Sequence, residues 1–181
     1  MRKNLIYVVL IVTVGAVFAI PSSREFLKKT FLPVATVENA ATISDEDFDL
    51  DLKGINTAST NLKNLRDKTI FLNYWGTWCA PCRKEWPTIQ AMYDTRKDKM
   101  NFVLIAMKDE EENVVKYLKE NNYNVRVYIA QSPISEKILP KAFPTTFLLD
   151  KSGRILLKED AYKDWNSESS LEFIDAATKK Y

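Results

Sequence analysis

The chain has two cysteines, Cys79 and Cys82, and only two residues separate them. Trp78 precedes the first cysteine, and a segment with a helical pattern follows the second. This layout lets one disulfide form and break at the tip of a helix. A helix N-terminus favours negative charge, and the thiolate is the attacking species in thiol–disulfide exchange. We therefore expect Cys79 to attack a substrate and Cys82, one turn further along, to resolve the mixed disulfide.

Other roles for this cysteine pair have less support. A disulfide between cysteines this close closes a very small loop and constrains little of the unfolded chain. A structural zinc site needs about four Cys or His ligands, and the sequence has two Cys and no His. Two incidental buried thiols remain an alternative. The pair therefore predicts redox chemistry carried by the protein's own sulfurs, without a metal or a cofactor.

Composition excludes several classes of function. The 181 residues are 46% apolar, which suggests one domain of ordinary size with accessory segments. Lys and Arg total 26 against 24 Asp and Glu, and Arg2 and Lys3 account for the excess. A neutral body gives no electrostatic reason to expect nucleic-acid binding. The absence of His removes the imidazole base of a hydrolase, a His haem ligand and a His metal site.

The N-terminus has the layout of a targeting segment. Arg2 and Lys3 precede the uncharged run Leu5–Ile20, which as a helix would span about 24 Å, slightly less than a hydrocarbon core. The run fits either an uncleaved anchor or a signal peptide, with Val17–Ala19 as a possible cleavage site. Residues 1–21 are therefore predicted to be a membrane anchor or signal segment. Both alternatives place the rest of the chain outside the cytoplasm.

Two further regions follow this segment. Residues 22–44 are predicted to form a juxtamembrane helix and linker, because Ser22–Leu32 has a helical pattern and Pro33–Ser44 has little pattern. From Asp45 onward apolar residues recur in strand and helix patterns up to the end of the chain. Residues 45–181 are therefore predicted to be the folded domain.

Within that domain, strand patterns alternate with helix patterns. Strands are expected over Phe48–Lys53, Thr69–Tyr74, Asn101–Met107, Val125–Ile129, Thr145–Asp150 and Arg154–Lys158. Helices are expected over Ala80–Lys97 (with Pro87 inside), Glu110–Asn121, Ile134–Leu139 and Ser167–Lys180, with a helical turn over Leu62–Leu65. Alternating elements followed by a hairpin and a helix predict an α/β sheet flanked by helices.

Three residues beside the cysteine pair could shape its surroundings. Trp75 and Trp78 are expected to wall the loop between strand and helix, although either could fill the core instead. We expect Trp78 to offer partners an apolar surface. Pro144 stands at the entrance of a strand, where it cannot donate to the ladder and often marks a special turn. On propensity alone, its peptide bond is expected to be trans.

The two motifs together are recognisable. The run Asn73–Pro87 (NYWGTWCAPCRKEWP), followed by Phe143–Gly153 (FPTTFLLDKSG), closely resembles the thioredoxin-like proteins of the TlpA/ResA group. The resemblance covers roughly Asp45–Tyr181, and both motifs occur in the expected order. It implies a thioredoxin-like α/β fold, a central mixed β-sheet flanked by helices, preceded here by an N-terminal hydrophobic helix.

The resemblance also implies roles for individual residues. Cys79 would be the exposed nucleophile and Cys82 the buried resolving thiol of a redox-active disulfide, with Pro81 between them as part of the active-site motif. Pro144 would be a cis-proline packed beside the disulfide. The backbone of Phe143 would then be free to pair with an extended substrate peptide.

The chain departs from the family pattern in how it could manage protons. Asn73 stands where thioredoxins proper often carry a buried Asp, and Ala80 stands where some ResA-like proteins carry a Glu. Glu85 is usual in the group. It could take the proton of Cys82, or it could simply lie on a solvated helix face. We expect the solvated face.

The function implied by the resemblance is reduction of protein disulfides outside the cytoplasm. Members of the group are extracytoplasmic and often membrane-tethered. They take electrons from a transmembrane thiol reductant, and their targets include apocytochromes c before haem attachment. An oxidase or isomerase of the same fold, or a non-catalytic tethered binding module, remains an alternative.

The expected location follows from the same two sources. We expect a single-pass protein of the bacterial cytoplasmic membrane, held through residues 5–20, with its catalytic domain on the periplasmic side. If the signal were cleaved, the protein would instead be secreted to the periplasm.

Overall fold

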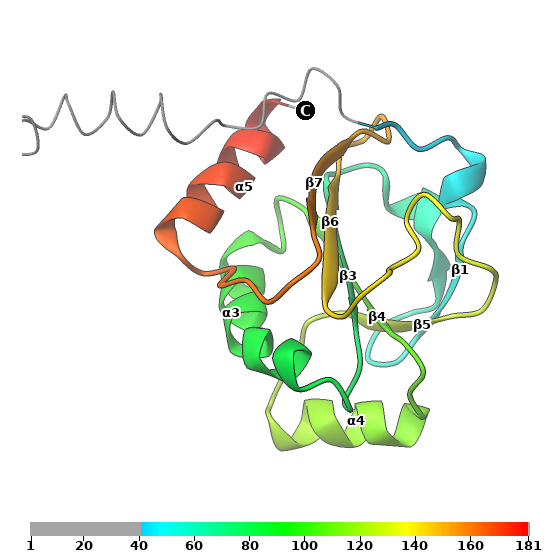
Figure 1. Ribbon diagram of the computed structural model, residues 1–181, viewed down its shortest axis with the longest axis vertical. Helices are drawn as coiled ribbons and strands as arrows, with labels where there is room; N and C mark the ends of the chain where they lie inside the picture. The colour runs from blue at the N-terminus through cyan, green and yellow to red at the C-terminus, as the bar shows by residue number, and fades with distance from the viewer. Residues whose placement is uncertain (1–40, 181) are drawn as a thin grey trace, which may run out of the picture. The chain divides into compact units, whose positions relative to one another are not determined.

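In the computed structural model, which describes residues 41–180, strands form a seven-stranded sheet in the order β2-β1-β5-β4-β3-β6-β7 (Figure 1). The strands are β1 (Asp51–Gly54), β2 (Thr60–Asn61), β3 (Ile70–Trp75), β4 (Asn101–Ala106), β5 (Val127–Ala130), β6 (Thr145–Leu149) and β7 (Ile155–Glu159). The helices are α3 (Ala80–Arg96), α4 (Glu111–Glu120) and α5 (Glu168–Lys180), with 3-10 turns η2 (Glu46–Phe48) and η3 (Leu62–Leu65).

The sheet is mixed, as the family resemblance implies. Strands β3, β4 and β5 are parallel to one another, whereas β6 and β7 on one side and β1 and β2 on the other are antiparallel to their neighbours. Every residue of β3 and β4 is buried. Continuous burial is expected for central strands that are covered on both faces, and it explains why both segments are unbroken apolar runs apart from one Asn in each.

The two faces of the sheet pack against different parts of the chain. On one face, alternate strand residues such as Leu72 and Val103 belong to the same hydrophobic cluster as the segment before β1. In that segment Phe48 and Leu50 are fully buried. The opposite face is covered by α3 and α5, which lie on the same side of the sheet (Figure 1). There Phe71 of β3 packs edge-on against Trp165 with the ring centroids 4.9 Å apart.

Helix α3 begins directly after Cys79, its N-cap residue. Pro81 occupies the first turn of the helix, where a missing N–H costs no hydrogen bond. The helix continues through Pro87 to Arg96. Near its end, the Arg96 guanidinium donates to both carboxylate oxygens of Asp175 on α5, at 2.9 and 3.1 Å, and so joins the two helices.

Except for β2, the strands are where the sequence predicts them, within a few residues, and so are the three long helices and the turn at Leu62. One predicted element is wrong. Ile134–Leu139 forms no helix and instead is a loop with a single turn. The carboxylate of Asp47, in η2, accepts hydrogen bonds from the Ser135 hydroxyl and the Lys137 ammonium group and so holds this loop in place. Proline at positions 133 and 140 brackets the segment too closely for a stable helix.

The start of the domain also differs from the prediction. Phe48 lies in the 3-10 turn η2, and strand β1 begins only at Asp51. Strand β2 was not predicted, because its two residues are too few to show a period.

The hairpin between β6 and β7 turns where the sequence predicts it, at residues 151–153. Gly153 has a φ of 88°, and a Cβ at this position would lie 2.5 Å from the backbone oxygen of Ile43. The buried carboxylate of Asp150 accepts hydrogen bonds from Ser152 and Arg154, which closes the turn. The turn thus fixes the register of the strand pair that starts at Thr145.

The predicted membrane segment, residues 5–20, lies outside the described residues. Within residues 41–180, no helix combines the length and the apolar character that crossing a membrane requires. The division of the chain into residues 1–21, 22–44 and 45–181 therefore stays a prediction.

Candidate active site

Cys79 and Cys82 are joined by a disulfide, so the structure shows the oxidised form of the pair. The sulfur of Cys79 also accepts a hydrogen bond from the backbone N–H of Cys82, at 3.3 Å. Cys82 is fully buried and Cys79 is 4% exposed. The implied exposure of Cys79 is therefore wrong for this form, in which the sulfur is bonded inward to Cys82. Cys79 is nevertheless the more accessible of the two.

The loop before Cys79 is shaped around the side chain of Trp78. The indole N–H of Trp78 donates to the backbone oxygen of Met107, at 2.9 Å. Its ring folds back over Gly76, where a Cβ would lie 2.4 Å from the indole nitrogen, so only glycine fits. Trp78 is still 51% exposed and packs edge-on against Phe143. It is therefore a fixed aromatic surface next to the disulfide.

Trp75 has the other role that the sequence allowed. It is fully buried and packs against Trp86 of α3 and Tyr117 of α4. Trp75 therefore fills the core where these two helices meet the end of β3.

The bond between Phe143 and Pro144 is cis, as the family resemblance implies. Strand β6 begins at the next residue, Thr145, which pairs with Tyr74 of β3. In this register Pro144 comes opposite Trp75, where β3 leaves the sheet toward Cys79. Pro144 is buried, whereas Phe143 is half-buried and contacts Trp78. The two motifs that are far apart in the sequence therefore meet at one end of the sheet.

Glu85 is where the structure overturns a prediction. It is not on a solvated face but is 1% exposed, three residues after Cys82 on α3. The carboxylate accepts hydrogen bonds from the Asn73 amide, at 2.9 Å, and from the Trp165 indole N–H, at 3.3 Å. A further, longer contact comes from the backbone N–H of Lys163. The prediction of a solvated helix face is wrong because β3 and the segment before α5 cover this turn of α3.

Burial changes the acidity of this carboxyl group. Desolvation raises the pKa of Glu85 from 4.5 to about 7, although the hydrogen bonds from Asn73, Lys163 and Trp165 oppose the shift. Residues three apart on a helix are neighbours, with Cβ atoms about 5–6 Å apart. The Glu85 carboxyl group therefore lies beside Cys82 and has a pKa near neutral pH.

Asn73 and Thr146 complete this buried polar cluster. The Asn73 amide nitrogen donates to the Thr146 hydroxyl as well as to Glu85, but its oxygen Oδ1 is buried without a partner. A rotated amide would offer that oxygen to a protonated Glu85. The sequence pointed to neither Asn73 nor Trp165 as a partner of Glu85, because they are 12 and 80 residues away from it along the chain. It also gave no sign of Thr146 as the partner of Asn73, from which it is 73 residues away.

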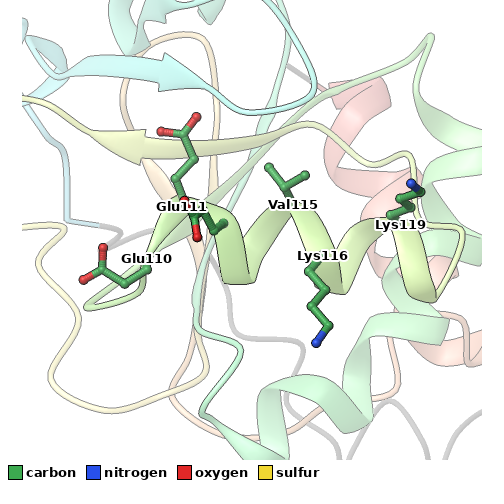
Figure 2. Close-up of a pocket in the computed structure, with 6 residues that line it drawn as sticks. Glu110, Glu111, Val115, Lys116 and Lys119 are labelled. Atoms are coloured by element: carbon green, nitrogen blue, oxygen red, sulfur yellow. The ribbon is translucent and has the colours of Figure 1, made fainter.

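A shallow groove lies on the surface along α4 (Figure 2). Its lining is mostly charged: Glu110, Glu111, Glu112, Val115, Lys116 and Lys119. Neither cysteine lines it, and neither does Trp78 or Phe143. Within residues 41–180, no cluster of three or more His, Cys, Asp or Glu side chains could hold a metal ion.

A buried cysteine pair at a helix N-cap defines the class of thioredoxin-like proteins when a cis-proline also stands at the entrance of the strand that pairs with the one before the cysteines. The family model described as thioredoxin-like matches residues 67–155. Among solved structures, a DsbE-type putative thiol:disulfide interchange protein from Chlorobium tepidum has a TM-score of 0.64 at 24% identity, over 77% of this chain and 96% of that one. StoA from Bacillus subtilis has a TM-score of 0.58 at 22% identity, over 68% and 94%.

Curated relatives make the family more specific. The thiol-disulfide oxidoreductase ResA of Bacillus thuringiensis subsp. konkukian is 31% identical over 134 residues, which are 72% of this chain and 71% of that protein. ResA of Bacillus cereus is 36% identical over 110 residues, 60% of this chain, and the match spans 62% of that relative's length. The chain belongs to the ResA family of thioredoxin-like thiol–disulfide oxidoreductases.

The raised pKa of Glu85 predicts how stability depends on pH. Between pH 4.5 and 7 the folded protein binds the extra proton and the unfolded chain does not, so stability falls as pH rises through this window. The loss is about 3 kcal/mol between pH 4.5 and 8. The chain has no His, and the carboxyl groups with lowered pKa titrate below this window. Denaturant unfolding of the oxidised protein at several pH values measures the slope.

Glu85→Gln should flatten this dependence, because the amide fills the same space without titrating. Glu112→Gln makes the same chemical change at an exposed position of α4 and should keep the wild-type slope. A slope that persists in Glu85→Gln would assign the pH dependence to another group.

Proposed function

We propose that this protein is an extracytoplasmic thiol–disulfide oxidoreductase that reduces disulfides in protein substrates. The observation that carries the proposal is the disulfide between Cys79 and Cys82 at the start of α3, next to exposed Trp78 and the cis bond before Pro144. Membership of the ResA family supports the same chemistry. The match to the ResA of Bacillus cereus spans about 62% of that relative's length.

The chemistry starts from the dithiol form. The Cys79 thiolate attacks one sulfur of a substrate disulfide, and the other substrate sulfur leaves as a thiolate. Cys82 then loses its proton and attacks the Cys79 sulfur, which releases the second substrate sulfur. Two electrons pass to the substrate, two protons end on its thiols, and the protein is left with the Cys79–Cys82 disulfide seen in the structure.

Glu85 is suited to accept the proton of Cys82. Cys82 is fully buried, so bulk water has poor access to its thiol. The pKa of Glu85, about 7, lies near that of an ordinary thiol and near ambient pH, which favours proton transfer in either direction. Ala80 and Asn73 stand where related proteins can carry a Glu or an Asp. Glu85 is therefore the buried carboxyl group closest in sequence to the cysteine pair among the described residues.

The surface beside the disulfide fits an extended peptide. Phe143 precedes the cis bond, and within residues 41–180 its backbone N–H and C=O make no hydrogen bond to other backbone groups. An incoming strand could pair with them while its side chains contact Trp78. Haem-attachment segments of apocytochromes c, which carry two nearby cysteines, are one substrate class of this kind.

Location and electron supply complete the proposal. The uncharged run at residues 5–20, preceded by Arg2 and Lys3, supports a single-pass anchor with the redox domain on the periplasmic side. The alternative is a cleaved signal and a periplasmic protein. A reductase in this compartment needs electrons from the cytosol, so a transmembrane thiol reductant is the expected partner.

A trapping experiment tests the activity. In full-length Cys82→Ala, the mixed disulfide on Cys79 cannot be resolved, and substrate proteins should remain attached until a reductant is added. Cys79→Ala in the same background should trap nothing. Identification of the attached proteins names the substrates.

The oxidation state of the wild-type protein in cells shows whether it reduces or oxidises its substrates. A reductase should be held as the dithiol, and its substrates should accumulate disulfides when the protein is deleted. Recovery as the disulfide, with substrates that lack their bonds after deletion, would establish an oxidase. Full function from a Cys79→Ser, Cys82→Ser protein would leave only a binding module.

The proton role of Glu85 predicts a pH profile. Resolution of the mixed disulfide should speed up as pH rises through about 7, because only the ionised carboxylate can accept the proton. Glu85→Gln should slow this step about tenfold or more and remove the rise. Single-turnover release of the second product thiol measures it. An unchanged profile in Glu85→Gln would show that Glu85 has no such role.

Protease protection tests the location. The full chain should sediment with membranes, and protease added to spheroplasts should degrade it. A variant without residues 1–21 should stay in the cytosol and be protected. Soluble periplasmic protein of reduced mass would establish a cleaved signal, whereas protection of the full chain would contradict the proposed orientation.

A further inference from the structure

The segment between β4 and α4 holds the loop that carries Cys79. Met107 contacts the loop twice: its backbone N–H donates to Trp75 at 2.8 Å, and its oxygen accepts from the Trp78 indole. The chain then turns at Lys108, which has a φ of 51°. Next, the carboxylate of Asp109 accepts from both the backbone N–H and the hydroxyl of Thr77. The loop before the nucleophile is therefore clamped at three positions, Trp75, Thr77 and Trp78.

Asp109 brings a negative charge to this clamp. Thr77 is two residues before Cys79, so the carboxylate lies within about 10 Å of the Cys79 backbone even for an extended chain. The actual separation is shorter, because the Cys79 N–H donates to Gly76 and makes this loop a turn. Among the described residues, no Lys or Arg forms an ion pair with Asp109. Its charge is not neutralised locally.

Other charged groups near the pair are placed differently. Arg83 and Lys84 lie on the first turns of α3, and Lys108 lies in the clamp, but all three side chains are exposed, where water screens them. Glu85 is buried on the Cys82 side and is neutral for part of the working pH range. Asp109 is half-buried and fixed by two hydrogen bonds. Its electrostatic effect on Cys79 should therefore be stronger than that of the exposed side chains and more constant with pH than that of Glu85.

We propose that Asp109 is a positioning residue that fixes the loop before Cys79 and whose charge disfavours the Cys79 thiolate. This inference rests on the proposed function. It supplies a physical reason why electrons pass from the protein to its substrates and not the other way. A thiolate that is less stable makes the dithiol form less stable relative to the disulfide. The protein then gives up two electrons more readily, so Asp109 makes it a better reductant.

Asp109→Asn separates charge from position. The amide oxygen can still accept from the Thr77 N–H, and the amide N–H can donate to the Thr77 hydroxyl. The Cys79 thiol should then have a pKa lower by about one unit, from the Coulomb energy of a charge about 10 Å away in a partly buried site. The pH dependence of alkylation in the Cys82→Ala background measures this value and requires no substrate turnover.

The redox equilibrium gives a second readout. The protein dithiol and oxidised glutathione exchange to give the protein disulfide and two molecules of glutathione. In Asp109→Asn this equilibrium should move toward the dithiol by up to about tenfold, equivalent to about 30 mV. The shift should grow from pH 6 to pH 9, because charge matters only where the thiolate is populated. A purely structural loosening, as expected in Asp109→Ala, would add a shift that is independent of pH.

Glu112→Gln is the matched control. It removes one carboxylate from the same acidic run, at an exposed position on α4, and should leave both readouts unchanged. An unaltered or raised Cys79 pKa in Asp109→Asn, or an equal effect of Glu112→Gln, would overturn the proposal. If Cys82→Ala traps no substrate yet Asp109→Asn lowers the thiol pKa, the proposed function fails while this inference stands.

Discussion

The pairing of β3 with β4 on one side and with β6 on the other is the constraint on which the site depends. Because β3 and β4 are parallel, the loops after Trp75 and Ala106 leave the same end of the sheet. Because β6 is antiparallel to β3, its first residue, Thr145, lies at that end too. The cysteine loop, the clamp and the cis bond therefore come from three separate segments and meet without any long insertion.

This meeting point explains why the site is rigid around a reactive bond. Each of the three loops is tied to another by contacts of a different kind: a backbone clamp from Met107, an aromatic contact between Trp78 and Phe143, and the strand register. A rigid surface lowers the entropy lost when a peptide binds. A thiol–disulfide exchange site gains from this, because the attacking and leaving sulfurs must be brought into line.

Glu85 shows what it costs the fold to keep a carboxyl group in its interior. A buried carboxyl group destabilises the folded protein above its pKa, and the three hydrogen bonds it receives only partly offset the loss of water. The rest of the core, with continuous burial in β3 and β4, provides the stability that tolerates this cost. The arrangement places a group with a pKa near 7 in a chain that has no His.

Sequence patterns predicted the features that depend on neighbours in the chain. The cysteine spacing, the apolar runs of β3 and β4 and the hairpin turn at residue 153 are local signals. The burial of Glu85 and the contact between Asp109 and Thr77 depend on residues 80 and 32 positions apart, and no local pattern encodes them. The helix predicted at Ile134–Leu139 is wrong partly for the same reason, because Asp47, far upstream, holds that segment as a loop. The prolines at positions 133 and 140 are a local signal against that helix.

The hydrogen bond from the Trp165 indole to Glu85 ties the chemistry to the far end of the chain. Trp165 lies just before α5, and α5 is fastened to α3 by Arg96 and Asp175. Partial undocking of this C-terminal helix would admit solvent to the carboxyl group and let it release its proton at lower pH. The proton affinity of Glu85 on α3 therefore depends on whether α5 is docked.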